Sequence, residues 1–128
     1  MKKILFIEDE PTLQKTFGDI IREKGYKMVS ALDGETGLKL VEIENPDLIL
    51  LDVILPKMHG FEVLEKLKKN PKTKEIPVII LTNLERTEDV DKAIELGATT
   101  YLVKTSYSLE EVIEKIRKTL NTDQSKEE

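Results

Sequence analysis

Five short segments that are expected to form strands alternate along the chain with five segments whose apolar residues recur at helical spacing. The strand segments lie at residues 3–7, 27–31, 48–51, 78–81 and 99–103, and those at 3–7, 48–51 and 78–81 are aliphatic runs. Runs of branched aliphatics are typical of strands buried on both faces of a parallel sheet. Their strict alternation with helices predicts an α/β fold, and right-handed crossovers favour a doubly wound sheet. We therefore expect a five-stranded parallel sheet covered by five helices.

Local signals mark where several of the helices begin and end. Pro11 suits a first helical turn, where its missing N–H is no loss, and Gly25 ends that helix. Asp33 can cap the next helix, and Ser108 with Glu111 has the spacing of a capping box before the last one. These signals place helices between the expected strands.

The fourth and fifth helices carry two further expectations. Val90, Ala93 and Ile94 are expected to face the core from a helix that finishes at Gly97. The last helix is expected to end near residue 120, because residues 121–128 are polar and have no apolar face. We therefore expect one domain at 1–120, followed by a frayed end or the start of a linker.

Composition excludes several classes of protein. The 128 residues include no cysteine, which rules out disulfides and thiolate metal sites. The apolar runs are too short to span a bilayer, and nothing at the N-terminus resembles a secretory signal. The net charge is −5 and no basic block stands out, so we expect no direct nucleic-acid binding by this segment. These features indicate a soluble, cytoplasmic protein.

Polar residues stand at the carboxyl ends of four of the expected strands: Glu8, Asp9, Asp52, Thr82 and Lys104. In doubly wound sheets this edge is where ligands bind. Three carboxylates cannot share a pocket without cations, because their repulsion would raise a pKa and protonate one of them. A Mg²⁺ ion, which prefers oxygen ligands, together with the lysine would offset that charge.

These residues and their spacing resemble the receiver domain of bacterial two-component response regulators. The resemblance covers roughly residues 2–120 and includes the Pro56-x-x-x-Gly60 loop. It implies a flavodoxin-like fold with strand order 2-1-3-4-5. It also implies a signalling domain that catalyses only its own phosphorylation and slow dephosphorylation, rather than an enzyme acting on external substrates.

The resemblance implies a role for each acid. Asp52 would accept a phosphoryl group from a phosphohistidine on a sensor histidine kinase or phosphotransfer protein. Glu8 and Asp9 would be the acidic pair for Mg²⁺, joined by Asp52 and the backbone carbonyl of Ile54. The chemistry is also sound by itself, because a carboxylate nucleophile that forms an acyl phosphate is a known covalent strategy.

The remaining residues of the pattern would read out the phosphoryl group. By the resemblance, Thr82 would hydrogen-bond its oxygens, Lys104 would pair with them, and Tyr101 would be the aromatic switch residue. Movement of Thr82 would open space for Tyr101 and change the surface of the fourth helix and fifth strand. That surface would control an output partner or domain.

The sequence departs from the commonest pattern of this family at several positions. Glu8 stands where Asp is more usual, and Asn83 stands where a small residue is usual. Ile54 and Leu84 cannot orient an attacking water, so we expect slow hydrolysis of the acyl phosphate. Thr105 replaces a proline that the family usually holds in a cis bond; for a non-proline residue that bond costs about 2.5–4 kcal/mol.

Three other functions are alternatives to a phosphoacceptor. An Asp-nucleophile phosphatase typically has a second acid two residues after the nucleophile, where this chain has Ile54. A flavin carrier needs a phosphate-binding loop after the first strand, and Glu8-Asp9-Glu10 would repel the phosphate. A degenerate receiver that serves as a constitutive docking module stays open, because of Asn83 and Thr105.

Overall fold

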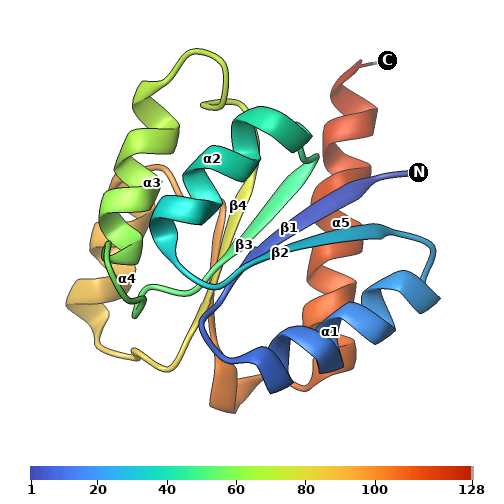
Figure 1. The fold of residues 1–128 in the computed structure, drawn as a ribbon, viewed down its shortest axis with the longest axis horizontal. Coiled ribbons are helices and arrows are strands. Elements are labelled where there is room, and N and C mark those ends of the chain that lie inside the picture. Colours follow the sequence, from blue (N-terminus) through green and yellow to red (C-terminus); the bar gives the residue numbers. More distant parts are fainter. Residues whose placement is uncertain (128) are drawn as a thin grey trace.

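The computed structural model describes residues 1–127, with side chains described through Asn121. Five parallel strands form one sheet in the order β2-β1-β3-β4-β5 (Figure 1). The strands are β1 (Lys3–Ile7), β2 (Lys27–Ala31), β3 (Leu48–Leu51), β4 (Val78–Thr82) and β5 (Thr100–Val103). The expected fold class and strand order are confirmed.

Helices cover both faces of this sheet (Figure 1). They are α1 (Pro11–Glu23), α2 (Gly34–Glu44), α3 (Gly60–Lys69), α4 (Thr87–Glu95) and α5 (Leu109–Glu127), with a 3₁₀ turn at Lys104–Ser106. Side chains alternate along each strand, so one strand supplies both cores. In β1, Leu5 and Ile7 pack with residues of α2, α3 and α4, whereas Ile4 and Phe6 pack with residues of α1 and α5.

The last helix is longer than the sequence indicates. α5 continues through residues 121–127, which we expected to form a polar tail or linker start. Glu128 lies outside the described residues, and a domain boundary at 120 stays a prediction. None of the described helices, α5 included, is both long and apolar enough to cross a membrane.

The end signals seen in the sequence are confirmed. Pro11 occupies the first turn of α1, and Gly25 follows that helix with φ +95°, a conformation that glycine adopts without strain. Asp33 caps α2, its Oδ1 accepting from Thr36 N at 2.8 Å. Ser108 and Glu111 exchange two hydrogen bonds of 2.9 and 3.1 Å at the start of α5.

One expected core residue lies outside the core. Ala93 of α4 is fully buried and Val90 is partly buried, but the side chain of Ile94 is 49% exposed. Adjacent helical residues point about 100° apart, so a narrow buried stripe through Ala93 turns Ile94 toward solvent. The expectation that Ile94 faces the core was therefore wrong. Among its described residues, α4 buries only Ala93.

The loop between β3 and α3 turns tightly beneath Asp52. Gly60 N donates to Val53 O at 2.7 Å, and a Cβ built on Gly60 would lie 2.5 Å from Asp52 O and from Val53 Cα. His59 precedes it and caps α3, its Nδ1 accepting from Phe61 N at 3.1 Å. Glycine is required here because the backbone of Asp52 and Val53, just after β3, leaves no room for a side chain.

We predict that Gly60→Ala destabilises the fold and that Gly18→Ala does not. Gly60→Ala drives a methyl into backbone that cannot give way, which should lower the free energy of unfolding by about 1–3 kcal/mol. Gly18 lies inside α1 beside the flexible ends of Arg22 and Met28, so alanine there should be neutral or stabilising by up to about 1 kcal/mol. Urea unfolding followed by circular dichroism measures both. A Gly60→Ala variant as stable as wild type would contradict the close approach.

Candidate functional site

The register of the sheet brings the acids of β1 and β3 together. Ile7 pairs with Leu51, and Asp52 N donates to Ile7 O at 3.0 Å. The residues that follow each strand, Glu8 and Asp52, therefore leave the sheet side by side. This pair of strands is also the switch point of the doubly wound sheet, where connections run to opposite faces.

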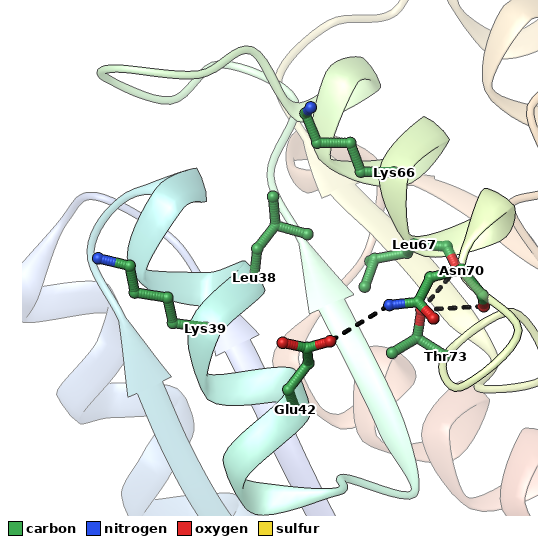
Figure 2. A pocket seen from close by; sticks show the side chains of 7 residues that line it. All are labelled: Leu38, Lys39, Glu42, Lys66, Leu67, Asn70 and Thr73. Atoms are coloured by element: carbon green, nitrogen blue, oxygen red, sulfur yellow. Dashed lines mark hydrogen bonds between the residues drawn. The ribbon is translucent and has the colours of Figure 1, made fainter.

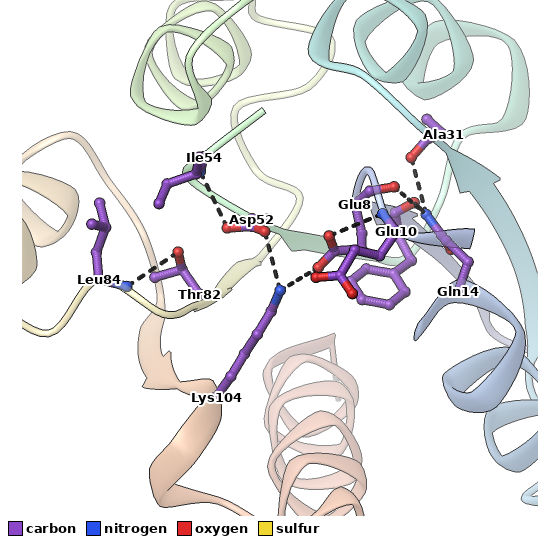
Figure 3. A network of polar contacts seen from close by, with 10 residues as sticks. Glu8, Glu10, Gln14, Ala31, Asp52, Ile54, Thr82, Leu84 and Lys104 are labelled. Carbon is purple, nitrogen blue, oxygen red and sulfur yellow. Dashed lines mark hydrogen bonds and ion pairs between the residues drawn. The ribbon is translucent and has the colours of Figure 1, made fainter. Parts of the chain in front are cut away.

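Lys104 reaches both carboxylates from the end of β5 (Figure 3). Its Nζ lies 2.5 Å from Glu8 Oε1 and 3.1 Å from Asp52 Oδ2. The remaining oxygens accept from backbone, Asp52 Oδ1 from Ile54 N at 3.2 Å and Glu8 Oε2 from Glu10 N at 3.3 Å. Glu8 is fully buried and Asp52 is 5% exposed, so these contacts fix both carboxylates against the protein.

One ammonium does not fully offset the acids around it. Burial raises the pKa of Glu8 to about 7; the hydrogen bond from Lys104 opposes this rise and the nearby charge of Asp52 adds to it. Burial lowers the pKa of Lys104, but its bonds to Glu8 and the charge of Asp52 outweigh that effect and leave the pKa raised. Lys104 therefore stays charged at neutral pH, while Glu8 sits where a further cation would hold it ionised.

The acidic cluster fits a divalent cation. Glu8, Asp9 and Asp52 each offer an oxygen, and these oxygens lie within 4.8 Å of one another. Asp9 is exposed, which leaves a side of the cluster open to solvent for the waters that Mg²⁺ usually keeps. Carboxylates with open access are the donor set for a hard cation such as Mg²⁺ or Mn²⁺. A part for the Ile54 carbonyl stays a prediction.

Thr82 and Tyr101 both bond to the backbone of Leu84 rather than to the acids. Thr82 is fully buried, and its Oγ1 accepts from Leu84 N at 3.5 Å (Figure 3). The Tyr101 hydroxyl donates to the carbonyl of the same Leu84 at 2.8 Å. Burial, followed by the charges of Asp89 and Asp52, raises the pKa of Tyr101 to about 12, so the hydroxyl keeps its proton. The backbone of Leu84 thus joins the two residues.

The departures from the family pattern leave this geometry intact. All peptide bonds among the described residues are trans, including the one between Lys104 and Thr105, and Lys104 still reaches both carboxylates. Asn83 is exposed, while Ile54 is 52% exposed beside Asp52. Leu84 is partly buried. The site is therefore flanked by apolar side chains.

Sequence reasoning missed Gln14. This side chain is 6% exposed, and its Nε2 lies within 2.9–3.1 Å of the carbonyls of Phe6, Glu8 and Ala31. A signal was available, because Gln14 precedes the buried Phe17 by three residues and so belongs to the apolar face of α1. A polar residue on a buried stripe needs hydrogen-bond partners, and these partners lie at the site.

A cavity lies between α2 and α3, away from the acidic cluster (Figure 2). Its volume is about 230 Å³ and it is lined by Leu38, Lys39, Glu42, Lys66, Leu67, Asn70 and Thr73. Asn70 Nδ2 donates to Glu42 Oε1 across it at 3.3 Å. This lining holds a single carboxylate, so it lacks the paired acids found at the carboxyl edge of the sheet.

Comparison with known proteins gives the family. The model of the response regulator receiver domain matches residues 4–117. The chain belongs to this family. Among solved structures, a CheY-like receiver domain protein from Methanospirillum hungatei is 30% identical with a TM-score of 0.91, the match covering 100% of this chain and 99% of that one. The Mn²⁺-bound form of the response regulator Rcp1 is 34% identical with a TM-score of 0.75, covering 81% of each chain.

Curated relatives are longer than this receiver. The DNA-binding dual master transcriptional regulator RpaA of Synechocystis is 36% identical over 117 residues, which are 91% of this chain and 48% of that protein. The chain thus spans about half the length of the first curated relatives it matches. The similarity to these relatives therefore establishes a response regulator receiver domain and does not extend to the rest of their length.

The raised pKa of Glu8 predicts a pH dependence of stability in buffer with EDTA. Between about pH 4.5 and pH 7 the folded receiver holds a proton on Glu8 that the unfolded chain has released. Stability should therefore fall as pH rises through this window, by up to about 1.4 kcal/mol per pH unit. Urea unfolding at pH 5, 6 and 7 measures the slope.

Two substitutions separate Glu8 from the other acids. Glu8→Gln should flatten that part of the slope, because the side chain can no longer ionise. Glu75→Gln removes an exposed carboxylate and should leave the slope as in wild type. An equal slope in wild type and Glu8→Gln would show that Glu8 is ionised in the folded state without added metal.

Proposed function

We propose that this receiver is a phosphoacceptor, with Asp52 taking a phosphoryl group from a phosphohistidine of a sensor histidine kinase or phosphotransfer protein. One observation carries the proposal: a lysine contacts Asp52 and Glu8 together, in a cluster that Asp9 completes. A nearly buried carboxylate with that partner is held ready as a nucleophile. The surrounding charges suit a group that arrives with several negative oxygens.

The transfer exchanges one bond to phosphorus for another. A carboxylate oxygen of Asp52 attacks phosphorus, a P–O bond forms, and the P–N bond to the donor imidazole breaks with its electron pair leaving on nitrogen. Asp52 Oδ1 is oriented by Ile54 N, while Lys104 at Oδ2 lies where it can pair with the phosphoryl oxygens. Glu8, Asp9, Asp52 and the Ile54 carbonyl would hold Mg²⁺, which supplies charge neutralisation for those oxygens.

The readout runs through the backbone of Leu84. Thr82 is the last residue of β4, and turning its hydroxyl toward a phosphoryl oxygen would break its 3.5 Å contact with Leu84 N. Leu84 O is held by Tyr101 at 2.8 Å, so a shift of the Leu84 backbone would reach β5 and the start of α4. We propose that the α4–β5 surface, with Tyr101 as its switch residue, carries the signal to an output partner or domain.

We place the phosphoryl transfer in the cytoplasm, as the sequence leads us to expect, with no nucleic-acid contact by this segment. RpaA is named as a DNA-binding transcriptional regulator, and an output of that kind would need residues beyond this receiver. A degenerate receiver that docks without phosphorylation is the second candidate, favoured by the exposed Asn83 beside Thr82.

Phosphorylation by a small donor tests the proposal. Incubation with Mg²⁺ and acetyl phosphate should add one phosphate, measured by intact mass spectrometry. Asp52→Asn should abolish the adduct because the nucleophile is gone, and EDTA should abolish it because the acids then repel the donor. Glu75→Gln serves as a matched control and should be phosphorylated like wild type. No adduct under any condition would favour the docking module.

The apolar flanks predict a long-lived acyl phosphate. Ile54 and Leu84 offer no side-chain group that could orient a hydrolytic water. Ile54→Asn should shorten the phosphorylated half-life several-fold, whereas Ile54→Leu, which keeps an apolar side chain, should change it less than twofold. Loss of the adduct with time after removal of acetyl phosphate gives the half-life. A wild-type half-life of only seconds would contradict the prediction.

A further inference from the structure

The interior of α1 holds a buried amide that the proposed chemistry does not use. Gln14 is 6% exposed, and its Nε2 lies 2.9 Å from Phe6 O, 3.1 Å from Glu8 O and 3.0 Å from Ala31 O (Figure 3). An amide nitrogen has two hydrogens, so the three carbonyls share them. One side chain of α1 therefore gathers the carboxyl ends of β1 and β2.

We infer that Gln14 is a positioning residue for the divalent-cation site, acting through the backbone of the acidic pair. This inference rests on the cation site of the proposed function. Glu8 N donates to Ala31 O at 3.0 Å, and Glu8 O accepts from Gln14 Nε2. Both polar groups of the Glu8 backbone are thus held, and Ala31 O also accepts from the same amide.

The hold extends to the other two acids. Glu8 O belongs to the peptide group that joins Glu8 to Asp9, and that group is planar, so fixing the carbonyl also fixes the direction in which Asp9 begins. Between Phe6 and Glu8, two of the three residues whose carbonyls accept from Gln14, lies Ile7, whose own carbonyl accepts from Asp52 N at 3.0 Å. The amide therefore braces the end of β1, which Glu8 and Asp9 follow in the chain and to which Asp52 N is hydrogen-bonded.

Packing alone does not account for a glutamine here. Gln14 Oε1 is buried and has no hydrogen-bond partner among the described residues. Methionine would fill a similar volume on this apolar face without burying an unpaired oxygen. The nitrogen is the half of the side chain that has partners, and those partners surround the acidic pair. The structure thus assigns the side chain to the site rather than to the core.

Mg²⁺ binding tests this role apart from activity. Isothermal titration calorimetry on wild type and Gln14→Met should show a dissociation constant at least fivefold higher in the variant, because the acids lose their common brace. Thr73→Val is the matched control: Thr73 is also buried, and its hydroxyl donates to Leu67 O at 2.7 Å, at the cavity between α2 and α3. The dissociation constant of Thr73→Val for Mg²⁺ should stay within twofold of the wild-type value, although urea unfolding should show a loss of stability comparable to that of Gln14→Met.

The outcomes distinguish the positioning role of Gln14 from the phosphoacceptor function on which it rests. Equal Mg²⁺ affinity in wild type and Gln14→Met overturns the positioning role and leaves the phosphoacceptor proposal standing. No Mg²⁺ binding by wild type overturns both. If Gln14→Met does not fold, Gln14→Asn keeps a buried amide that is one methylene too short to reach all three carbonyls. The same fivefold loss is then expected, and an unchanged affinity overturns the inference.

Discussion

The pairing of one ammonium with two buried carboxylates is the interaction on which the rest of this receiver depends. Lys104 follows β5 and its partners follow β1 and β3, so the contact joins the middle of the sheet to its edge. Without the lysine, Glu8 and Asp52 would face each other nearly free of solvent, and repulsion would protonate one of them. The pairing sets a positive charge against both carboxylates while leaving the cluster short of one cation.

The backbone around the cluster serves that arrangement. Gly60 lets the β3–α3 loop pass directly beneath Asp52, and Ile54 N then meets one carboxylate oxygen. On the other side, Gln14 and Ala31 hold the backbone of Glu8. These contacts come from a loop, from α1 and from the last residue of β2. A precise site thus depends on a few local contacts added at the edge of a generic fold.

The fold and the acids at the edge of the sheet could be predicted from the sequence, because the central strands are aliphatic runs. Aliphatic runs such as Leu48–Leu51 have no other economical reading in a chain of this length, and the polar residues that follow them must share one edge. Two features could not be predicted in full. Whether Ile94 faces the sheet together with Ala93 depends on how closely α4 approaches the sheet, a tertiary property. The spacing of Gln14 indicates a buried amide, but its partners are backbone carbonyls, which no residue pattern reveals.

The shallow burial of α4 means that the free energy of opening differs between this helix and the central strands. Its nine residues bury only Ala93 among those described, while β3 is buried throughout and β1 is buried in all but its first residue. Local opening of α4 therefore costs far less than global unfolding, and its amides should exchange with deuterium from a separate, low-energy unit. Under the proposed readout, a helix that buries so little could be displaced by a small change at the acids. The central strands would then keep their stability while the surface of α4 changes.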